Sequence, residues 1–303
     1  MPLTFAFLSS KLPPITNYQL PIPNYPFPIT YLSSRFATLN QHLLLPIAMP
    51  VTWNWRTCEE LPYLTCSLLE PWEHGFFTQQ FSPRTPVEIT LMLQPQAEAY
   101  RVKQVHGNVV LSPSKIEQKD TLAEADGLIT ELPGQAVWVA SADCTPVLIA
   151  DSTTGQVAAL HAGWRGTAAK IVPSAIALLQ SQGSKIENLK FALGPAISGT
   201  VYQVSDQVAL EVVSSISSDD SKLMQTLQEL PNPPILPDPH PGRVRLDVRR
   251  VIALQLENLG ISPEQVAVSP HCTYSQPEHF FSYRRDKLKL VQWSGIVSKH
   301  STV

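Results

Sequence analysis

Three short apolar runs in the middle of the chain constrain its fold more than any other feature. They are AVWVA, PVLIAD and QVAALHAGW, at residues 136–140, 146–151 and 156–164. Runs of four to six apolar, often β-branched residues between turn formers indicate strands that are buried on both faces. The turn-forming segments SADCT and STTG separate these runs. We therefore expect a covered sheet, with Cys144 and His161 held rigidly at strand ends.

Helical patterns follow the strands. One apolar stripe predicts a helix from Thr167 to about Gln182, with Gly183 as its end, and another predicts a helix that Asp247 caps and Gly260 ends. The stretch ISPEQVAVS then predicts a capped turn and a further strand. Strands and helices alternate without a strict βαβ repeat, which predicts an α/β mixed (α+β) fold in which one compact domain carries mixed β-sheets covered by helices.

The first 48 residues differ from the rest in composition. They contain eight prolines, no acidic residue, and only Lys11 and Arg35 as charges. Proline at this density blocks both helices and central strands. A mitochondrial or chloroplast transit peptide is usually Arg-rich and amphipathic, and this tract is neither. We expect a disordered Pro-rich extension over residues 1–48 and one folded domain over residues 49–303.

Composition narrows the class of partner. The chain has 44% apolar residues, a formal charge of −3 and a pI near 6.2, so a core can form and nothing attracts nucleic acid or an anionic membrane. No apolar run approaches the roughly 20 residues of a membrane-spanning helix. The four cysteines form no disulfide pattern, which favours a reducing cytoplasmic setting. We expect a small-molecule partner, and the sequence leaves the oligomeric state open.

Three residues have the chemistry of metal ligands: His106, Cys144 and His161. Imidazole nitrogen and thiolate sulfur are ligands that Zn²⁺ prefers, and three protein ligands leave one coordination position for water or substrate. Their spacing fits no compact zinc-finger signature. Taken singly, His106 is more typical of a solvated loop histidine and Cys144 of a small buried apolar residue, and a core histidine is an alternative for His161.

The short sequence motifs around these residues resemble those of a known family. In order, KQVHG, ADGLIT, SADCTPVLIAD, HAGWRGT, LGPAISGTVYQV and FFSYRRD are similar to the YfiH-like, laccase-domain or polyphenol-oxidoreductase-like proteins, also named peptidoglycan editing factor, over roughly residues 74–297. The resemblance implies that His106, Cys144 and His161 form the metal centre. It also implies phosphorolysis of the purine nucleosides adenosine, inosine and 5′-methylthioadenosine, with adenosine deamination alongside. The expected cofactor is Zn²⁺, with Cu²⁺ as an alternative because of its high affinity for such ligands.

Several further residues are candidates for the same site. Arg165 lies between glycines in GWRG and is a candidate anion contact, and Arg284 in SYRRD is a candidate for binding phosphate. The resemblance adds Cys272 as a thiol near the pocket. Ordinary surface charge and a simple buried cysteine are the alternatives. Other residues expected near the site are Asp143, as an acceptor for a histidine N–H or as a turn cap, Lys103 and Gln104, as cavity lining, Arg285, as a phosphate contact, and His271, which we do not favour as a fourth ligand.

Three other functions compete with nucleoside chemistry. A conventional multicopper laccase needs paired HxH motifs, and this chain has eight histidines and no HxH, which leaves only a simpler copper-dependent polyphenol oxidoreductase. A cysteine hydrolase, such as an enzyme that edits peptidoglycan precursors, would use Cys144 as nucleophile and His161 as base. A non-enzymatic zinc module would need a fourth ligand, His271 or Cys272.

Segment 78–100 departs from the family pattern, which puts substrate contacts there in doubt.

Overall fold

The first of two large sheets carries the N- and C-terminal strands of the folded part. The computed structural model describes residues 51–116, 121–216, 227 and 229–301. Neighbouring strands of this sheet are antiparallel except β4 and β7, which are parallel. In spatial order the sheet comprises β1 (Trp53–Cys58), β2 (Leu61–Cys66), β3 (His74–Phe77), β15 (Gln292–Val297), β7 (Gln135–Ser141) and β4 (Glu98–Arg101).

The second large sheet contains the most buried strands. Its two outermost pairs are parallel and its inner pairs are antiparallel. In spatial order it comprises β14 (Val266–Val268), β10 (Leu189–Leu193), β8 (Thr145–Asp151), β9 (Val157–Ala162), β6 (Gly127–Ile129) and β5 (Val110–Leu111). A small antiparallel sheet lies beside it, made of β11 (Gln203–Ser205), β13 (Arg243–Leu246) and β12 (Ile235–Pro237).

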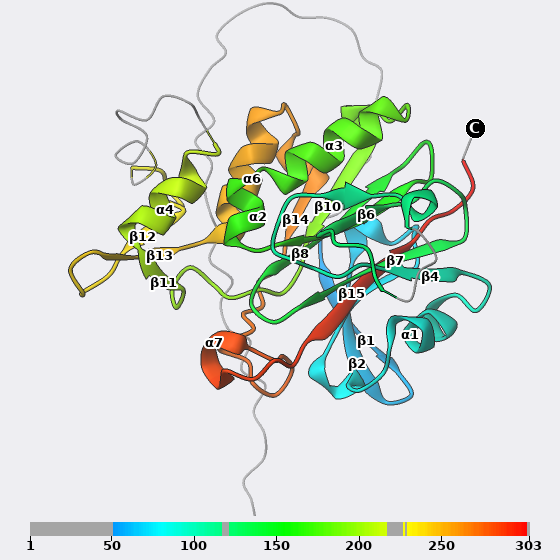
Figure 1. Cartoon of the computed structure of the whole chain (residues 1–303), viewed down its shortest axis with the longest axis horizontal. Helices are drawn as coiled ribbons and strands as arrows, with labels where there is room; N and C mark the ends of the chain where they lie inside the picture. The colour runs from blue at the N-terminus through cyan, green and yellow to red at the C-terminus, as the bar shows by residue number, and fades with distance from the viewer. Residues whose placement is uncertain (1–50, 117–120, 217–226, 228, 302–303) are drawn as a thin grey trace, which may run out of the picture. The chain divides into compact units, whose positions relative to one another are not determined.

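Helices cover the outer face of each large sheet (Figure 1). The longer helices pack on the second sheet, whereas α1 packs on the first. The described helices are α1 (Pro86–Leu93), α2 (Trp164–Ala168), α3 (Ile171–Ser181), α4 (Asp206–Val213), α6 (Val248–Asn258) and α7 (Tyr283–Asp286). Short 3₁₀ turns are η1 (Ser67–Leu69), η2 (Gln79–Phe81), η3 (Pro113–Lys115), η4 (Ile186–Asn188) and η5 (Pro263–Gln265).

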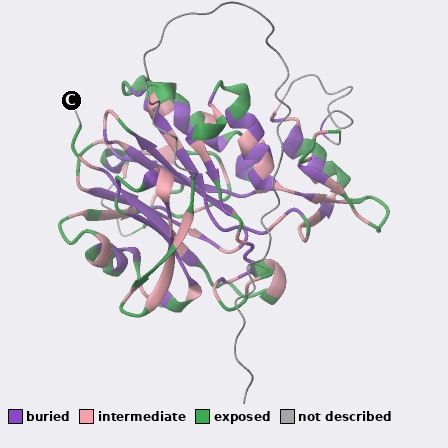
Figure 2. Cartoon of the chain, turned by 180° about the vertical axis from the view of Figure 1, so that it is seen from behind, coloured by how far each residue is buried: buried purple, intermediate pink, exposed green. Residues whose placement is uncertain are grey.

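Alternate residues along β8 show how the layers are packed. Val147 and Ile149 join the cluster under the helices, whereas Leu148 and Ala150 join the cluster between the two sheets. Because side chains alternate along a strand, a strand buried on both faces must be apolar throughout. The strands therefore form the buried centre of the molecule (Figure 2). The prediction of an α/β mixed fold with helix-covered sheets is confirmed.

One predicted helix differs from the structure. Lys170 adopts a left-handed conformation with φ of 60°, so the residues before it form the separate short helix α2, and the long helix begins at Ile171, not at Thr167. The second predicted helix is confirmed, since the Asp247 side chain accepts a hydrogen bond from the Arg250 amide at 3.1 Å. The capped turn before β14 is also present.

The divergent segment 78–100 forms regular structure. Thr85 and Glu88 make a reciprocal capping box, and Pro86 occupies the first turn, where its missing N–H costs nothing. This segment therefore supplies η2, α1 and β4.

The Pro-rich extension predicted over residues 1–48 lies outside the described residues, so the boundary at residue 49 remains a prediction. Within the described part of the chain, every helix is too short or too polar to cross a membrane.

Candidate metal centre

Strand pairing places Cys144 beside His161. In the antiparallel pair of β8 and β9, Thr145 lies opposite Ala162 and Pro146 lies opposite His161. Cys144 directly precedes β8 and His161 is the penultimate residue of β9. The start of β8 therefore adjoins the end of β9, and the two side chains meet where these inner strands begin and end.

His106 reaches the same point from the loop after β4. The Gln104 side chain fixes this loop to β7, because its amide donates to the Ala140 carbonyl at 2.8 Å and its oxygen accepts from the Ala140 N–H at 2.7 Å. His106 itself has a left-handed backbone with φ of 64°. Such a conformation is uncommon for a non-glycine residue and needs support from the surrounding structure.

The three predicted ligands come together. One ligand atom from each of His106, Cys144 and His161 lies within 4.8 Å of the others, and no other such group of three occurs among the described residues. A tetrahedral zinc ion with bonds of about 2.0–2.3 Å holds its ligand atoms roughly 3.5 Å apart. Small side-chain rotations would bring all three atoms to one ion. Two imidazoles and a thiolate also suit copper, so this donor set fits a metal without identifying it.

Asp126 organises both histidines. Its buried carboxylate accepts hydrogen bonds from the backbone amides of Val105 at 3.2 Å, His106 at 2.9 Å and Gly107 at 2.6 Å. It also bonds Nδ1 of His161 at 2.9 Å. The carboxylate thus supports the strained turn at His106 and leaves Nε2 of His161 available as a ligand atom. The sequence offers Asp143 as a candidate for this second role, whereas in the structure the carboxylate that bonds His161 is that of Asp126.

Asp143 has a different task. Its φ of 92° lies in the left-handed region, so its side chain does not follow the alternation of a strand. Its carboxylate accepts from Oγ1 of Thr273 at 2.8 Å and from the backbone amide of Arg284 at 2.7 Å. Asp143 therefore caps the first turn of α7, which was the alternative considered from the sequence.

The electrostatics favour a thiolate at Cys144. Burial opposes ionisation, but His161 and then His106 outweigh it and lower the pKa of the Cys144 thiol to about 6. Burial likewise disfavours the charged form of His161, yet the Cys144 thiolate and the Asp126 carboxylate raise its pKa to about 9. Without a metal, the two groups form a thiolate–imidazolium pair. A metal ion would replace the imidazolium proton.

Two glycines of the HAGWRG motif allow α2 to pack closely against Cys144 and the His106 loop. A Cβ on Gly163 would lie 2.7 Å from Sγ of Cys144, and a Cβ on Gly166 would lie 2.8 Å from the carbonyl oxygen of Gly107. Any side chain at either position would push α2 away from the cysteine or from the His106 loop.

A cavity of about 580 Å³ opens in front of the metal-ligand triad of His106, Cys144 and His161. Its walls come from β4 and the His106 loop, from the turn before β8, and from the segment that joins α7 to β15. The lining combines apolar and aromatic side chains with a few cations, which is typical of a small-molecule site. Besides His106, Cys144 and His161, the lining includes Arg101, Lys103, Leu122, Leu288, Lys289, Leu290, Val291 and Trp293.

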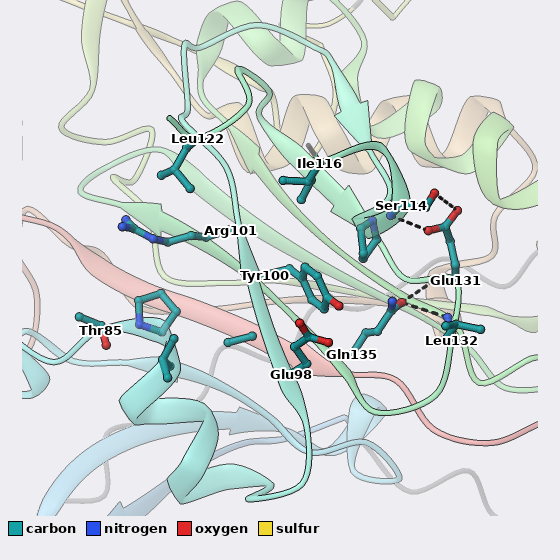
Figure 3. Close-up of a pocket in the computed structure, with 14 residues that line it drawn as sticks. Thr85, Glu98, Tyr100, Arg101, Ser114, Ile116, Leu122, Glu131, Leu132 and Gln135 are labelled. Atoms are coloured by element: carbon teal, nitrogen blue, oxygen red, sulfur yellow. Dashed lines mark hydrogen bonds between the residues drawn. The ribbon is translucent and has the colours of Figure 1, made fainter. Parts of the chain in front are cut away.

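A second cavity, of about 630 Å³, also has Arg101 in its lining (Figure 3). Arg101 and Leu122 line both cavities. In this second cavity, Glu131 accepts from the backbone amide and hydroxyl of Ser114 at 2.9 and 2.8 Å.

Arg165 and Arg284 lie near Cys144, outside the lining of the triad cavity. The Arg165 guanidinium is exposed and stacks on Trp164 at 4.3 Å. Arg284 donates to the Gln203 carbonyl at 2.8 Å. Burial, followed by the negative charge of Cys144, raises the pKa of Tyr202 to about 12, and the charges of both arginines also act on this phenol.

Cys272 and His271 do not join the triad. The Cys272 sulfur accepts from the Ser198 amide at 3.3 Å and lines neither cavity. His271 bonds Gln276 at 3.1 Å and packs against Trp55. No fourth His, Cys, Asp or Glu ligand therefore closes the group of three, as far as the described residues show.

Comparisons with known proteins agree on one family. Residues 84–297 match the family model described as multi-copper polyphenol oxidoreductase laccase. A purine nucleoside phosphorylase of Synechocystis sp. is 52% identical over 256 residues, which cover 81% of this chain and 97% of that relative. An adenosine deaminase from an unknown prokaryotic organism is 31% identical over 169 residues, which cover 56% of this chain and 60% of that relative.

Solved structures show the same fold. The crystal structure of YlmD from Geobacillus stearothermophilus matches with a TM-score of 0.66 at 24% identity, covering 81% of this chain and 99% of that one. A YfiH protein of Bacillus licheniformis matches with a TM-score of 0.65 at 24% identity, with the same coverage.

Proposed function

This chain belongs to the multi-copper polyphenol oxidoreductase laccase family, and on that premise we propose that it is a metal-dependent enzyme of purine nucleosides. In its specific form, the proposal is a zinc-dependent purine nucleoside phosphorylase that acts on adenosine, inosine and 5′-methylthioadenosine and also deaminates adenosine. The names of the relatives support both activities. Phosphate and purine nucleosides are the proposed substrates.

The observation that carries the proposal is an open set of three donors facing a cavity. His106, Cys144 and His161 converge at the wall of a cavity of about 580 Å³, which falls within the roughly 300–1,000 Å³ typical of small-molecule sites. Three protein ligands leave room for a substrate atom or water, whereas a structural zinc site is closed by four. This arrangement supports catalysis over a purely structural zinc module.

The proposed roles follow from the donor set. His106, Cys144 and His161 would hold the metal, which when bound would supply a Lewis acid that activates water for attack at purine C6 or polarises a phosphate or ribose oxygen. Asp126 would keep His161 in the correct tautomer. Arg165 or Arg284 would offset negative charge near Cys144 as the glycosidic bond breaks. Cys272 would act only through the loop that its Ser198 contact supports.

The test is an incubation of purified protein with adenosine, with and without phosphate, followed by chromatographic separation of adenine, hypoxanthine and inosine. Phosphate-dependent adenine indicates phosphorolysis, and inosine indicates deamination. The variant His161→Ala should lose bound metal and both reactions, because it removes a ligand. Exposed His300 offers a matched control, and His300→Ala should keep metal and activity. Full phosphorolysis by metal-free protein would refute the proposal.

A cysteine hydrolase is the second candidate, because Cys144, His161 and Asp126 are arranged like the catalytic Cys, His and Asp of such an enzyme. Asp126 bonds Nδ1 of His161, and the imidazoles lower the pKa of Cys144 to about 6. A thiolate beside an oriented imidazole is the usual form of an activated cysteine nucleophile. A peptidoglycan precursor would be a substrate of this class.

Metal analysis separates the two candidates. A zinc enzyme should contain one metal per chain, and the metal should protect Cys144 from iodoacetamide until a chelator removes it. Protein purified without metal, and alkylated rapidly at Cys144 with loss of all activity, would favour the hydrolase. A copper-dependent oxidoreductase would instead need copper at the same residues and oxidation of a phenol.

A further inference from the structure

The triad cavity is positively charged. Three cationic side chains line it, Arg101, Lys103 and Lys289, and no Asp or Glu side chain is among its described lining residues. The Lys103 ammonium is already paired with Glu124 at 2.8 Å. Arg101 and Lys289 have no carboxylate partner among the described residues, so their charges are available to a ligand.

Arg101 is held at the junction of the two cavities. It is the last residue of β4, and its guanidinium carbon lies 5.8 Å from the Trp293 ring. Figure 3 shows its side chain extending from the strand away from Glu98 and Glu131, the two acidic residues of the neighbouring cavity. The planar guanidinium therefore keeps its donors free for an anion and matches the geometry of phosphate.

Lys289 is surrounded by exposed apolar side chains. Leu288 is 57% exposed, Leu290 43% and Val291 41%, and all three line the cavity with Lys289 on the segment between α7 and β15. Exposed apolar side chains concentrated at a cavity mark a binding surface more often than chance. Lys289 is itself exposed, so its ammonium group is accessible to a ligand that enters the cavity.

We propose that Arg101 and Lys289 form a subsite for a phosphate dianion, with the apolar side chains of residues 288, 290 and 291 covering the less polar part of the nucleoside. This proposal rests on the proposed function and assigns the co-substrate to residues that the sequence did not single out. Arg165 and Arg284 do not line this cavity. Inorganic phosphate and the phosphate of a nucleotide share the chemistry that the subsite recognises.

The test compares Lys289→Gln with Lys287→Gln in metal-loaded protein, using calorimetric titration with inorganic phosphate and, separately, with adenosine 5′-monophosphate. Lys287 is an exposed lysine of the same segment outside the cavity lining, so its variant controls for the change in net charge. Lys289→Gln should weaken phosphate binding about tenfold, the effect of losing one charge-assisted hydrogen bond. Lys289→Arg should restore most of the affinity, and Lys287→Gln should leave it within about twofold.

Activity gives an independent readout. Lys289→Gln and Arg101→Gln should raise the phosphate KM about tenfold while leaving adenosine deamination, which uses no phosphate, within about twofold. If the two variants weaken the binding of adenosine 5′-monophosphate but not of inorganic phosphate, the subsite recognises the phosphate of a nucleotide. Unchanged binding of both ligands in Lys289→Gln and Arg101→Gln would overturn the proposal. A tenfold loss of phosphate affinity seen only in Arg165→Ala protein would also overturn it. Phosphate binding that depends on Lys289 in a protein without phosphorolysis would refute the proposed function alone.

Discussion

Asp126→Asn is the substitution whose effects follow most directly from the structure. The carboxylate accepts four hydrogen bonds, three from backbone amides of the His106 loop and one from Nδ1 of His161. An asparagine of the same shape has one acceptor oxygen and an NH₂ group. Two of the four donors must then face another donor. Since each buried donor left without a partner costs about 1–2 kcal/mol, the free energy of unfolding should fall by about 2–4 kcal/mol.

The same substitution should weaken metal binding. When the amide donates to Nδ1 of His161, the ring proton moves to Nε2, and the ligand atom is blocked. Removal of a group that orients a metal-bound histidine typically costs about 10–100-fold in metal affinity. Competition with a chromophoric chelator measures that affinity, and urea unfolding of metal-free protein measures the stability change.

Glu124→Gln is the matched control, because it makes the same change two residues away at an exposed ion pair with Lys103. Exposed pairs are worth about 0–1 kcal/mol, so the control should leave metal affinity unchanged. Asp126→Asn protein with wild-type metal affinity and a stability change below about 0.5 kcal/mol would refute the role assigned to this carboxylate.

Three other predictions follow from contacts of single residues. Gly163→Ala should lower metal affinity without unfolding the protein, because the new Cβ would lie 2.7 Å from the Cys144 sulfur, and chelator competition measures the loss. Leu148→Ala, in the layer between the sheets, should cost about 2–5 kcal/mol in urea unfolding, and a smaller loss would contradict the packing described. Hydrogen bonds, first from the His240 amide, hold the pKa of Asp238 below its usual value. Asp238→Asn should therefore destabilise the protein at neutral pH, and its difference from wild type should shrink as the pH falls below about 4, a trend that thermal melts across pH would reveal or exclude.

Local patterns sufficed to predict the buried strands, whereas the convergence of the three candidate ligands was implied by the resemblance to a known family. The apolar runs around Cys144 and His161 place both residues at strand ends, and a strand end is a local property of the sequence. Asp126 was missed because its role depends on which strand lies next to β9. Gly127 pairs with Leu160, so the preceding Asp126 falls beside His161, and no local pattern contains that register.

Left-handed backbone conformations account for the other differences. Lys170, with φ of 60°, interrupts a helix that the apolar pattern would continue, and Asp143, with φ of 92°, lies in the turn before β8. Neither residue is glycine, the residue that usually signals such a conformation. The subsite residues Arg101 and Lys289 were missed for another reason. They are charged residues on an edge strand and a connecting segment, and only the fold brings both to one cavity.

X-ray absorption at the zinc edge of the metal-loaded protein tests the central claim most directly, because it measures the ligands of the metal itself. We predict one sulfur at about 2.3 Å, two imidazole nitrogens at about 2.0–2.1 Å and one further light atom that substrate or phosphate exchanges. The sulfur signal should vanish in Cys144→Ser protein. A spectrum with no sulfur ligand, or with four ligands that no added substrate or phosphate changes, would contradict an open metal centre built on His106, Cys144 and His161.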